Sequence, residues 1–94
     1  MMTINKKIEL VRTIQTLSMK INLNSTTDIF TEFLGHVNGF HFRLYLNGWK
    51  SGEKPDYNKT VYIDMEKSEY TLNAILEHLK SLEKECLFKN KKII

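Results

Sequence analysis

The sequence predicts an α+β domain that consists of a helix, a three-stranded antiparallel meander and a second helix, with both helices on one face of the sheet. Apolar residues recur at steps of three and four near both ends of the chain, as in amphipathic helices. Between these segments, two apolar runs flank Asn38-Gly39, a dipeptide typical of two-residue hairpin turns. Residues 59–65 form a third run, in which apolar and polar side chains alternate. The 94 residues, 41% of them hydrophobic, suffice for one domain over 1–94 that ends in a basic tail at 88–94.

The first helix is expected over residues 4–22, with Thr3 as its N-cap. Lys6 and Lys7 lie in its first turn, where positive charge opposes the helix dipole, so this end is expected to fray. A polar break over residues 22–27 follows the helix. Its apolar stripe is broad and consists of Ile4, Ile8, Leu10, Val11, Ile14, Leu17, Ile21 and Leu23.

Two strands are expected around the turn, over residues 29–37 and 40–47. A two-residue turn places His36 directly opposite His41. Successive side chains of a strand point to opposite faces, so this register sorts the hairpin into a core face and an outer face. The core face carries Ile29, Thr31, Phe33, Gly35, Val37, Phe40, Phe42, Leu44 and Leu46. The outer face carries Phe30, Glu32, Leu34, His36, His41, Arg43, Tyr45 and Asn47.

Residues 28–37 also fit a helical spacing, which Ser25 and Asp28 could cap and Gly39 could end. The strand is favoured because Phe, Thr and Val suit a pleated surface. The hairpin register also pairs apolar residues with one another on the core face. The helix for residues 28–37 stays open as the alternative.

The rest of the chain supplies a loop, a strand and a helix. The loop is expected over residues 48–58, the third strand over 60–65 and the second helix over 69–87, which has an apolar stripe of its own. If both helices cover the core face, the buried core contains Phe33, Phe42 and Leu44 packed against Ile14, Leu17, Leu76 and Leu79.

The outer face is the candidate binding surface, because it keeps aromatic and apolar side chains around an arginine. Tyr, Phe and Arg are enriched at the centres of protein interfaces, and an exposed apolar patch usually marks a contact site. Alternatively, the loop that carries Trp49 and Tyr57 folds back over this face and makes a second small core. The predicted outer-face site consists of Phe30, Leu34, His36, His41, Arg43, Tyr45 and Tyr62. The predicted rim consists of Trp49, Lys50 and Tyr57.

Catalysis, metal binding and cofactors are not indicated. Two opposed histidines could share a metal ion, but a stable site needs a third and a fourth ligand, and none converges on them. The sequence holds neither a glycine-rich phosphate loop nor a Ser-His-Asp or Cys-His grouping. We therefore expect no enzyme activity, no metal and no cofactor.

The charge distribution argues against nucleic acid as the main partner. The formal net charge is +3, but the basic excess lies in residues 1–24 and 86–94, whereas residues 25–85 are acidic on balance. Nucleic-acid affinity comes mainly from lysines and arginines placed along phosphates. A regulator that binds nucleic acid through the basic termini and Arg43 stays as the alternative function. No run is apolar enough to span a membrane, and no secretory leader is recognised. The single cysteine, Cys86, excludes an internal disulfide, and a cytoplasmic location is expected.

The element order matches that of double-stranded RNA-binding domains, which grip phosphates with lysines at the start of their last helix. Here that position reads Ser68-Glu69-Tyr70-Thr71, which is acidic, so this assignment is rejected. The motifs Gly35-His36-Val37-Asn38-Gly39 and Asn47-Gly48-Trp49, followed by Pro55, resemble small proteins carried by phages and prophages of Gram-positive bacteria. That resemblance implies an accessory, host-interaction or anti-defence role in the cytoplasm of the host cell.

Together, these observations predict a small non-enzymatic binding protein. It is expected to associate with itself and to hold a host protein, or a small anionic ligand such as a nucleotide, through the outer sheet face.

Overall fold

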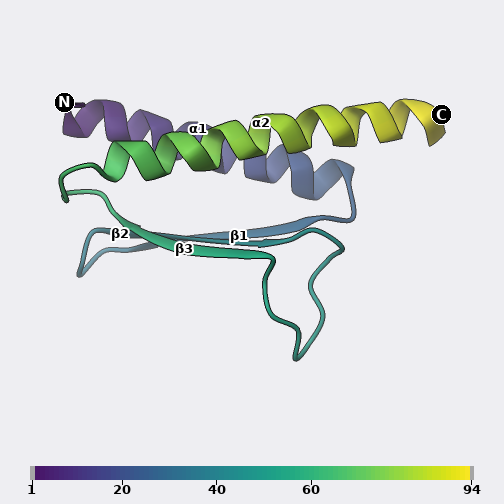
Figure 1. Cartoon of the computed structure of the whole chain (residues 1–94), viewed down its shortest axis with the longest axis horizontal. Helices are drawn as coiled ribbons and strands as arrows, with labels where there is room; N and C mark the ends of the chain where they lie inside the picture. Colours follow the sequence, from purple (N-terminus) through teal and green to yellow (C-terminus); the bar gives the residue numbers. More distant parts are fainter. Residues whose placement is uncertain (1, 94) are drawn as a thin grey trace.

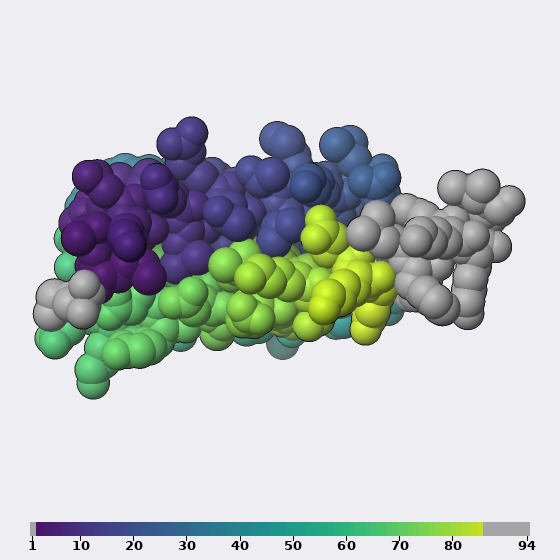
Figure 2. Space-filling model, turned by 90° about the horizontal axis from the view of Figure 1, so that it is seen from above, coloured from purple at the N-terminus to yellow at the C-terminus, as the bar shows by residue number. Residues whose placement is uncertain are grey.

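Two helices cover one face of a three-stranded antiparallel sheet in the computed structural model of the chain (Figure 1). The elements follow the order α1 (Ile4–Asn24), β1 (Asp28–Leu34), β2 (Gly39–Tyr45), β3 (Tyr57–Tyr62) and α2 (Ser68–Ile93). The central strand is β2, and α1 and α2 lie side by side above the sheet (Figure 2). The predicted α+β class and element order are confirmed. The structure describes residues 2–93, and side chains for residues 2–85, so the side chains of the tail expected at 88–94 lie outside the described part.

The start of α1 is fixed by two side chains. Thr3 is the N-cap, as predicted, and its hydroxyl oxygen accepts a hydrogen bond from the backbone N–H of Lys6 at 3.2 Å. Lys7 is buried, and its Nζ donates to the carbonyl oxygens of Ile63 at 3.1 Å and Met65 at 3.3 Å. This lysine therefore joins the first turn of α1 to the end of β3.

The hairpin forms, but its turn is wider than predicted. Residues 35–38 connect β1 to β2, and only Asn38 of the Asn38-Gly39 pair has a positive φ, of 53°. Glu32, not His36, lies opposite His41, so the predicted pairing of the two histidines is wrong. Every residue of β1 pairs four positions earlier on β2 than the two-residue turn requires. An even shift keeps each side chain on its predicted face, because faces alternate with a period of two. The strand interpretation of residues 28–37 holds for Asp28–Leu34, which excludes the helical alternative.

The core lies between the sheet and the two helices. Phe40, Phe42 and Leu44 of β2 are almost completely buried, as are Ile14 of α1 and Leu79 of α2. The Tyr57 ring lies edge-on between Phe42, at a centroid distance of 5.9 Å, and His78 of α2, at 6.2 Å. Phe33 is the exception to the predicted core, because 55% of its surface is exposed.

The free edge of β1 is partly closed by a side chain of α1. The side-chain amide of Asn22 donates to the carbonyl oxygen of Ile29 at 2.9 Å and accepts from its N–H at 2.7 Å. These two bonds imitate a neighbouring strand at this single residue. They also connect the end of α1 to the start of β1 across a short link.

Asn22→Ala is expected to lower the free energy of unfolding by about 1–2 kcal/mol, because two backbone–side-chain hydrogen bonds are lost at a partly exposed site. Urea denaturation followed by circular dichroism measures this change. Asn73→Ala, at an exposed position of α2, is the matched control and is expected to have little effect. Equal stability of the two variants would contradict a stabilising role for Asn22.

Candidate functional site

The outer face of the sheet presents three cross-strand rows. Pairing places Phe30, Arg43 and Asn58 in one row, Glu32, His41 and Thr60 in the next, and Leu34, Gly39 and Tyr62 in the third. Tyr45 lies beyond the first row, opposite Asp28. The structure therefore brings together most of the residues predicted for the outer-face site.

Several of these side chains contact one another. The guanidinium carbon of Arg43 lies 5.0 Å from the centre of the Phe30 ring, a cation–π geometry, and the Tyr45 ring meets Phe30 edge-on at 5.6 Å. Tyr45 is only 5% exposed, so the prediction that it is available to a partner is wrong. Its ring lies against Phe30 at the end of β2, where the connection to β3 begins.

The two histidines occupy different environments. His36 lies in the exposed turn between β1 and β2 and is not part of the sheet face, which corrects its predicted place. His41 stays on the outer face, and its Nε2 lies 2.7 Å from the side-chain oxygen of Asn58. No cluster of three His, Cys, Asp or Glu side chains that could hold a metal ion occurs among the described residues.

The three residues predicted for the rim do not lie together. Trp49 and Lys50 are exposed in the connection between β2 and β3, and the backbone N–H of Trp49 donates to the Asp28 carboxylate at 2.7 Å. Tyr57 does not lie in the loop: β3 begins three residues earlier than predicted, and pairing with Leu44 turns Tyr57 toward the core. The rim therefore contains Trp49 and Lys50 without Tyr57.

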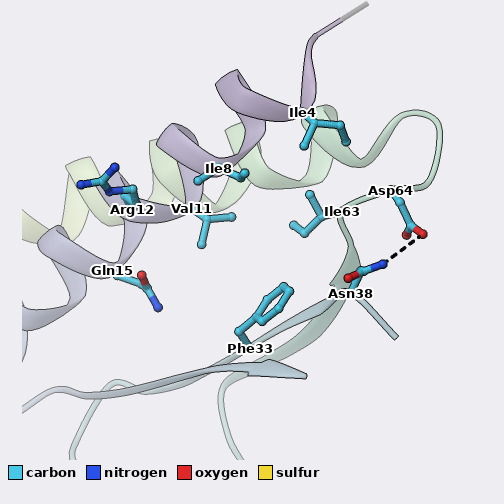
Figure 3. Close-up of a pocket in the computed structure, with 9 residues that line it drawn as sticks. All are labelled: Ile4, Ile8, Val11, Arg12, Gln15, Phe33, Asn38, Ile63 and Asp64. Atoms are coloured by element: carbon cyan, nitrogen blue, oxygen red, sulfur yellow. Dashed lines mark hydrogen bonds between the residues drawn. The ribbon is translucent and has the colours of Figure 1, made fainter. Parts of the chain in front are cut away.

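A second candidate site, which the sequence did not predict, lies on the helix side of β1. It is a cavity of about 470 Å³ between the N-terminal half of α1 and the end of β1. In Figure 3, Ile4, Ile8 and Val11 of α1 and Ile63 converge above the ring of Phe33, which rises from the sheet. We call this cavity the α1–β1 groove.

Polar groups lie at the two ends of the α1–β1 groove. Arg12 and Gln15 of α1 lie at one end, and Asn38 and Asp64 at the other (Figure 3). The Asn38 amide donates to the Asp64 carboxylate at a long 3.5 Å. An apolar floor with a few polar groups at its margins, at a volume within the range of roughly 300–1,000 Å³, is typical of a binding pocket.

The broad apolar stripe of the first helix is the sequence signal that could have indicated the groove. The apolar stripe of α1 is broader than the sheet and α2 can cover, and Ile4 and Ile8, one turn apart, stay exposed. The alternation along β1 assigns Phe33 to the helix side but does not say whether a helix covers that end of the strand. The sequence therefore did not reveal the groove, because a residue that faces the helix layer is not always covered by a helix.

Within residues 2–85, the cations on which nucleic-acid binding would depend are dispersed. Lys7 is buried against carbonyl oxygens, and Arg43 lies over the Phe30 ring. Arg12 and Lys20 are exposed on α1, and the lysines of the predicted tail lie outside the described side chains. None of the helices in the described part of the chain has the length and apolarity to cross a membrane.

Comparisons of the chain with protein-family models, with curated proteins and with solved structures found no match.

Proposed function

We propose that this chain is a small non-enzymatic binding protein that holds a segment of a partner polypeptide in the α1–β1 groove. The observation that supports the proposal is the exposure of Phe33, Ile4 and Ile8 around one concave space. Full burial of a large apolar side chain is worth roughly 1.5–3 kcal/mol, and a docked partner would recover part of this for each of these half-exposed side chains. A concave apolar surface of this kind suits a protein segment better than a charged small molecule.

The groove supports this function better than the outer sheet face does. On the outer face, Tyr45 is buried and Arg43 already stacks on Phe30, so less of their surface is left for a partner. Phe30 and Tyr62 stay partly exposed there, and the outer face remains a second candidate for self-association or for holding a host factor. The two surfaces lie on opposite sides of β1, so one experiment separates them.

The resemblance to small phage and prophage proteins suggests a host protein as the partner. A nucleotide is less well supported, because Arg12 is the cation that lines the groove and a phosphate group usually needs several donors. Among the described residues that line the groove, no nucleophile lies beside a base, which is the pairing that covalent catalysis by side chains requires, so the proposal is binding without a reaction.

Photo-crosslinking tests the proposal directly. A benzoylphenylalanine at position 33 is expected to capture a partner in cells of the host, whereas the same group at position 62 captures none. Tyr62 is the matched control because it is also aromatic and is 48% exposed, but it lies on the outer face of β3, two strands away from the free edge of β1. The added substitution Ile8→Glu is expected to abolish capture at position 33. Capture at position 62 alone would move the binding surface to the outer face and contradict the groove.

The nucleic-acid alternative predicts a different response to salt. Binding driven by phosphate contacts weakens steeply as salt rises, because counterions are released. Docking in an apolar groove is expected to persist between 50 mM and 500 mM sodium chloride. Loss of capture at position 33 over this range would favour the basic residues of the chain as the contact surface.

A further inference from the structure

We infer that the partner adds an extended strand to the free edge of β1, using Thr31 and Phe33 as its backbone contacts and presenting an apolar–basic–apolar sequence. The inference rests on the proposed function, since it specifies how the α1–β1 groove holds a polypeptide. Strand addition is a common mode of peptide recognition, in which backbone bonds supply affinity and alternate side chains supply specificity.

The direction of the backbone groups follows from Asn22. Both the N–H and the carbonyl oxygen of Ile29 bond to this side chain, so they point away from β2. In an antiparallel pair, residues alternate between those that bond to the neighbour and those that do not. The register of β1 is continuous, so Thr31 and Phe33 direct their backbone groups to the same free edge as Ile29.

Thr31 and Phe33 differ from Ile29 because, in the described part of the chain, their backbone groups on the free edge have no partner like Asn22. Among the described groups, which are the backbone of residues 2–93 and the side chains of residues 2–85, no hydrogen bond occupies the N–H or carbonyl oxygen of Thr31 or Phe33 on the free edge. Asn22 closes the edge at one end, and the turn at residues 35–38 ends it at the other. The available template is therefore short and has a defined position beside the groove.

The side chains of an added strand would be sorted by the same alternation. Residues opposite Thr31 and Phe33 would point to the helix side, because residues directly across a strand pair share a face. The residue between them would point to the outer face, beside Glu32. An apolar side chain suits the position opposite Phe33, because the groove lining there is apolar, and the position opposite Thr31 continues the same helix-side face.

The charge of Glu32 favours a basic residue at the middle position of the added strand, opposite Glu32. Glu32 is exposed on the outer face, and among residues 2–85 no ion pair involves its carboxylate. Opposite charges directly across a strand pair are stabilising, and like charges are destabilising. A lysine or arginine opposite Glu32 is therefore favoured.

Glu32 also disfavours a second copy of this chain as the occupant. A two-fold pairing of two β1 edges that leaves Asn22 in place and uses the backbone groups of both Thr31 and Phe33 puts Thr31 opposite Phe33 of the other copy, and Phe33 opposite Thr31. That pairing places the two Glu32 carboxylates directly opposite each other. Inward or edge charges of this kind are a known means of preventing sheets from joining. Glu32 therefore disfavours pairing of two β1 edges and favours pairing of β1 with a strand that carries a positive charge.

The test uses two capped pentapeptides, Thr-Val-Lys-Val-Thr and Thr-Val-Glu-Val-Thr, titrated into the isotope-labelled full chain and followed by NMR. The lysine peptide is expected to bind about three- to ten-fold more tightly than the glutamate peptide, the range for opposite against like cross-strand charges. On binding, the amide protons of Thr31 and Phe33 are expected to exchange more slowly with solvent.

Two controls identify the mode of binding. The Glu32→Lys variant is expected to reverse the preference, so that the glutamate peptide binds more tightly, whereas Lys59→Glu on β3 leaves the preference unchanged. A lysine peptide with both valine nitrogens methylated cannot donate the backbone hydrogen bonds that an antiparallel strand would make to the carbonyl oxygens of Thr31 and Phe33, and it is expected to lose binding at least about ten-fold.

The possible failures are distinguishable. Equal binding of the methylated peptide, or no reversal by Glu32→Lys, would overturn strand addition and leave the groove proposal standing. Failure of crosslinking at position 33 would overturn the groove itself. A wild-type chain that sediments as a dimer with protected Thr31 and Phe33 amides would show that a second copy occupies the edge, which would also overturn the inference.

Discussion

Phe42→Ala is expected to lower the free energy of unfolding by about 3–5 kcal/mol, the usual cost of removing a fully buried phenylalanine. Phe42 lies on the central strand and is 1% exposed, with its ring edge-on to Tyr57. Small domains are stabilised by only about 5–15 kcal/mol, so this loss is a large fraction of the total. Thermal unfolding followed by circular dichroism measures it, and the melting temperature is expected to fall by more than about 12 °C.

The matched control is Phe33→Ala, which removes the same side chain from the same side of the sheet. Phe33 is 55% exposed, so its removal is expected to change the free energy of unfolding by about 1 kcal/mol or less. The contrast between the two variants tests the location of the core. Equal destabilisation by both would mean that α1 closes over Phe33 and that the α1–β1 groove does not exist in solution.

The elements and faces of this fold were predictable from local patterns. Alternation along each strand and steps of three and four along each helix do not depend on the rest of the chain. They correctly assigned Phe42 to the core and Phe30 to the outer face, even though the register was wrong. The error in register came from the Asn38-Gly39 pair, which suggested a two-residue turn with two positive φ angles. A two-residue turn that places His36 opposite His41 also places Ile29 opposite Gly48, which has no side chain, whereas the observed register pairs Ile29 with Leu44.

The candidate site was only partly predictable, because coverage depends on how the layers are placed. Phe33 faces the helices, but α1 leaves a groove above it. Tyr45 faces outward but is buried against Phe30, and Tyr57 belongs to the core because β3 starts early. The alternation of apolar and polar residues does not predict whether these three side chains are covered. Their burial depends on where each helix or strand begins and ends.

Lys7 shows how tertiary contacts can reverse a local rule. A lysine in the first turn opposes the helix dipole, and the sequence predicted fraying there. In the structure, the side chain is 5% exposed, and its Nζ donates to the carbonyl oxygens of Ile63 and Met65. Both carbonyl oxygens also accept from Ser68, that of Ile63 from its hydroxyl at 3.0 Å and that of Met65 from its backbone N–H at 3.3 Å. Lys7 therefore adds a second donor to each carbonyl oxygen, and this long-range contact stabilises a lysine at a locally unfavourable position.

Lys7→Glu is therefore expected to lower the free energy of unfolding by about 3–5 kcal/mol, the cost of an uncompensated buried charge. A carboxylate has only acceptors to offer, and it would face the carbonyl oxygens of Ile63 and Met65. Lys6→Glu is the control, because Lys6 is exposed in the same helical turn, where a negative charge is favoured by the helix dipole. That variant is expected to be as stable as the wild type or slightly more stable. Urea denaturation of both compares them, and a Lys7→Glu variant with the stability of Lys6→Glu would mean that the Lys7 side chain lies in solvent, with the start of α1 detached from the end of β3.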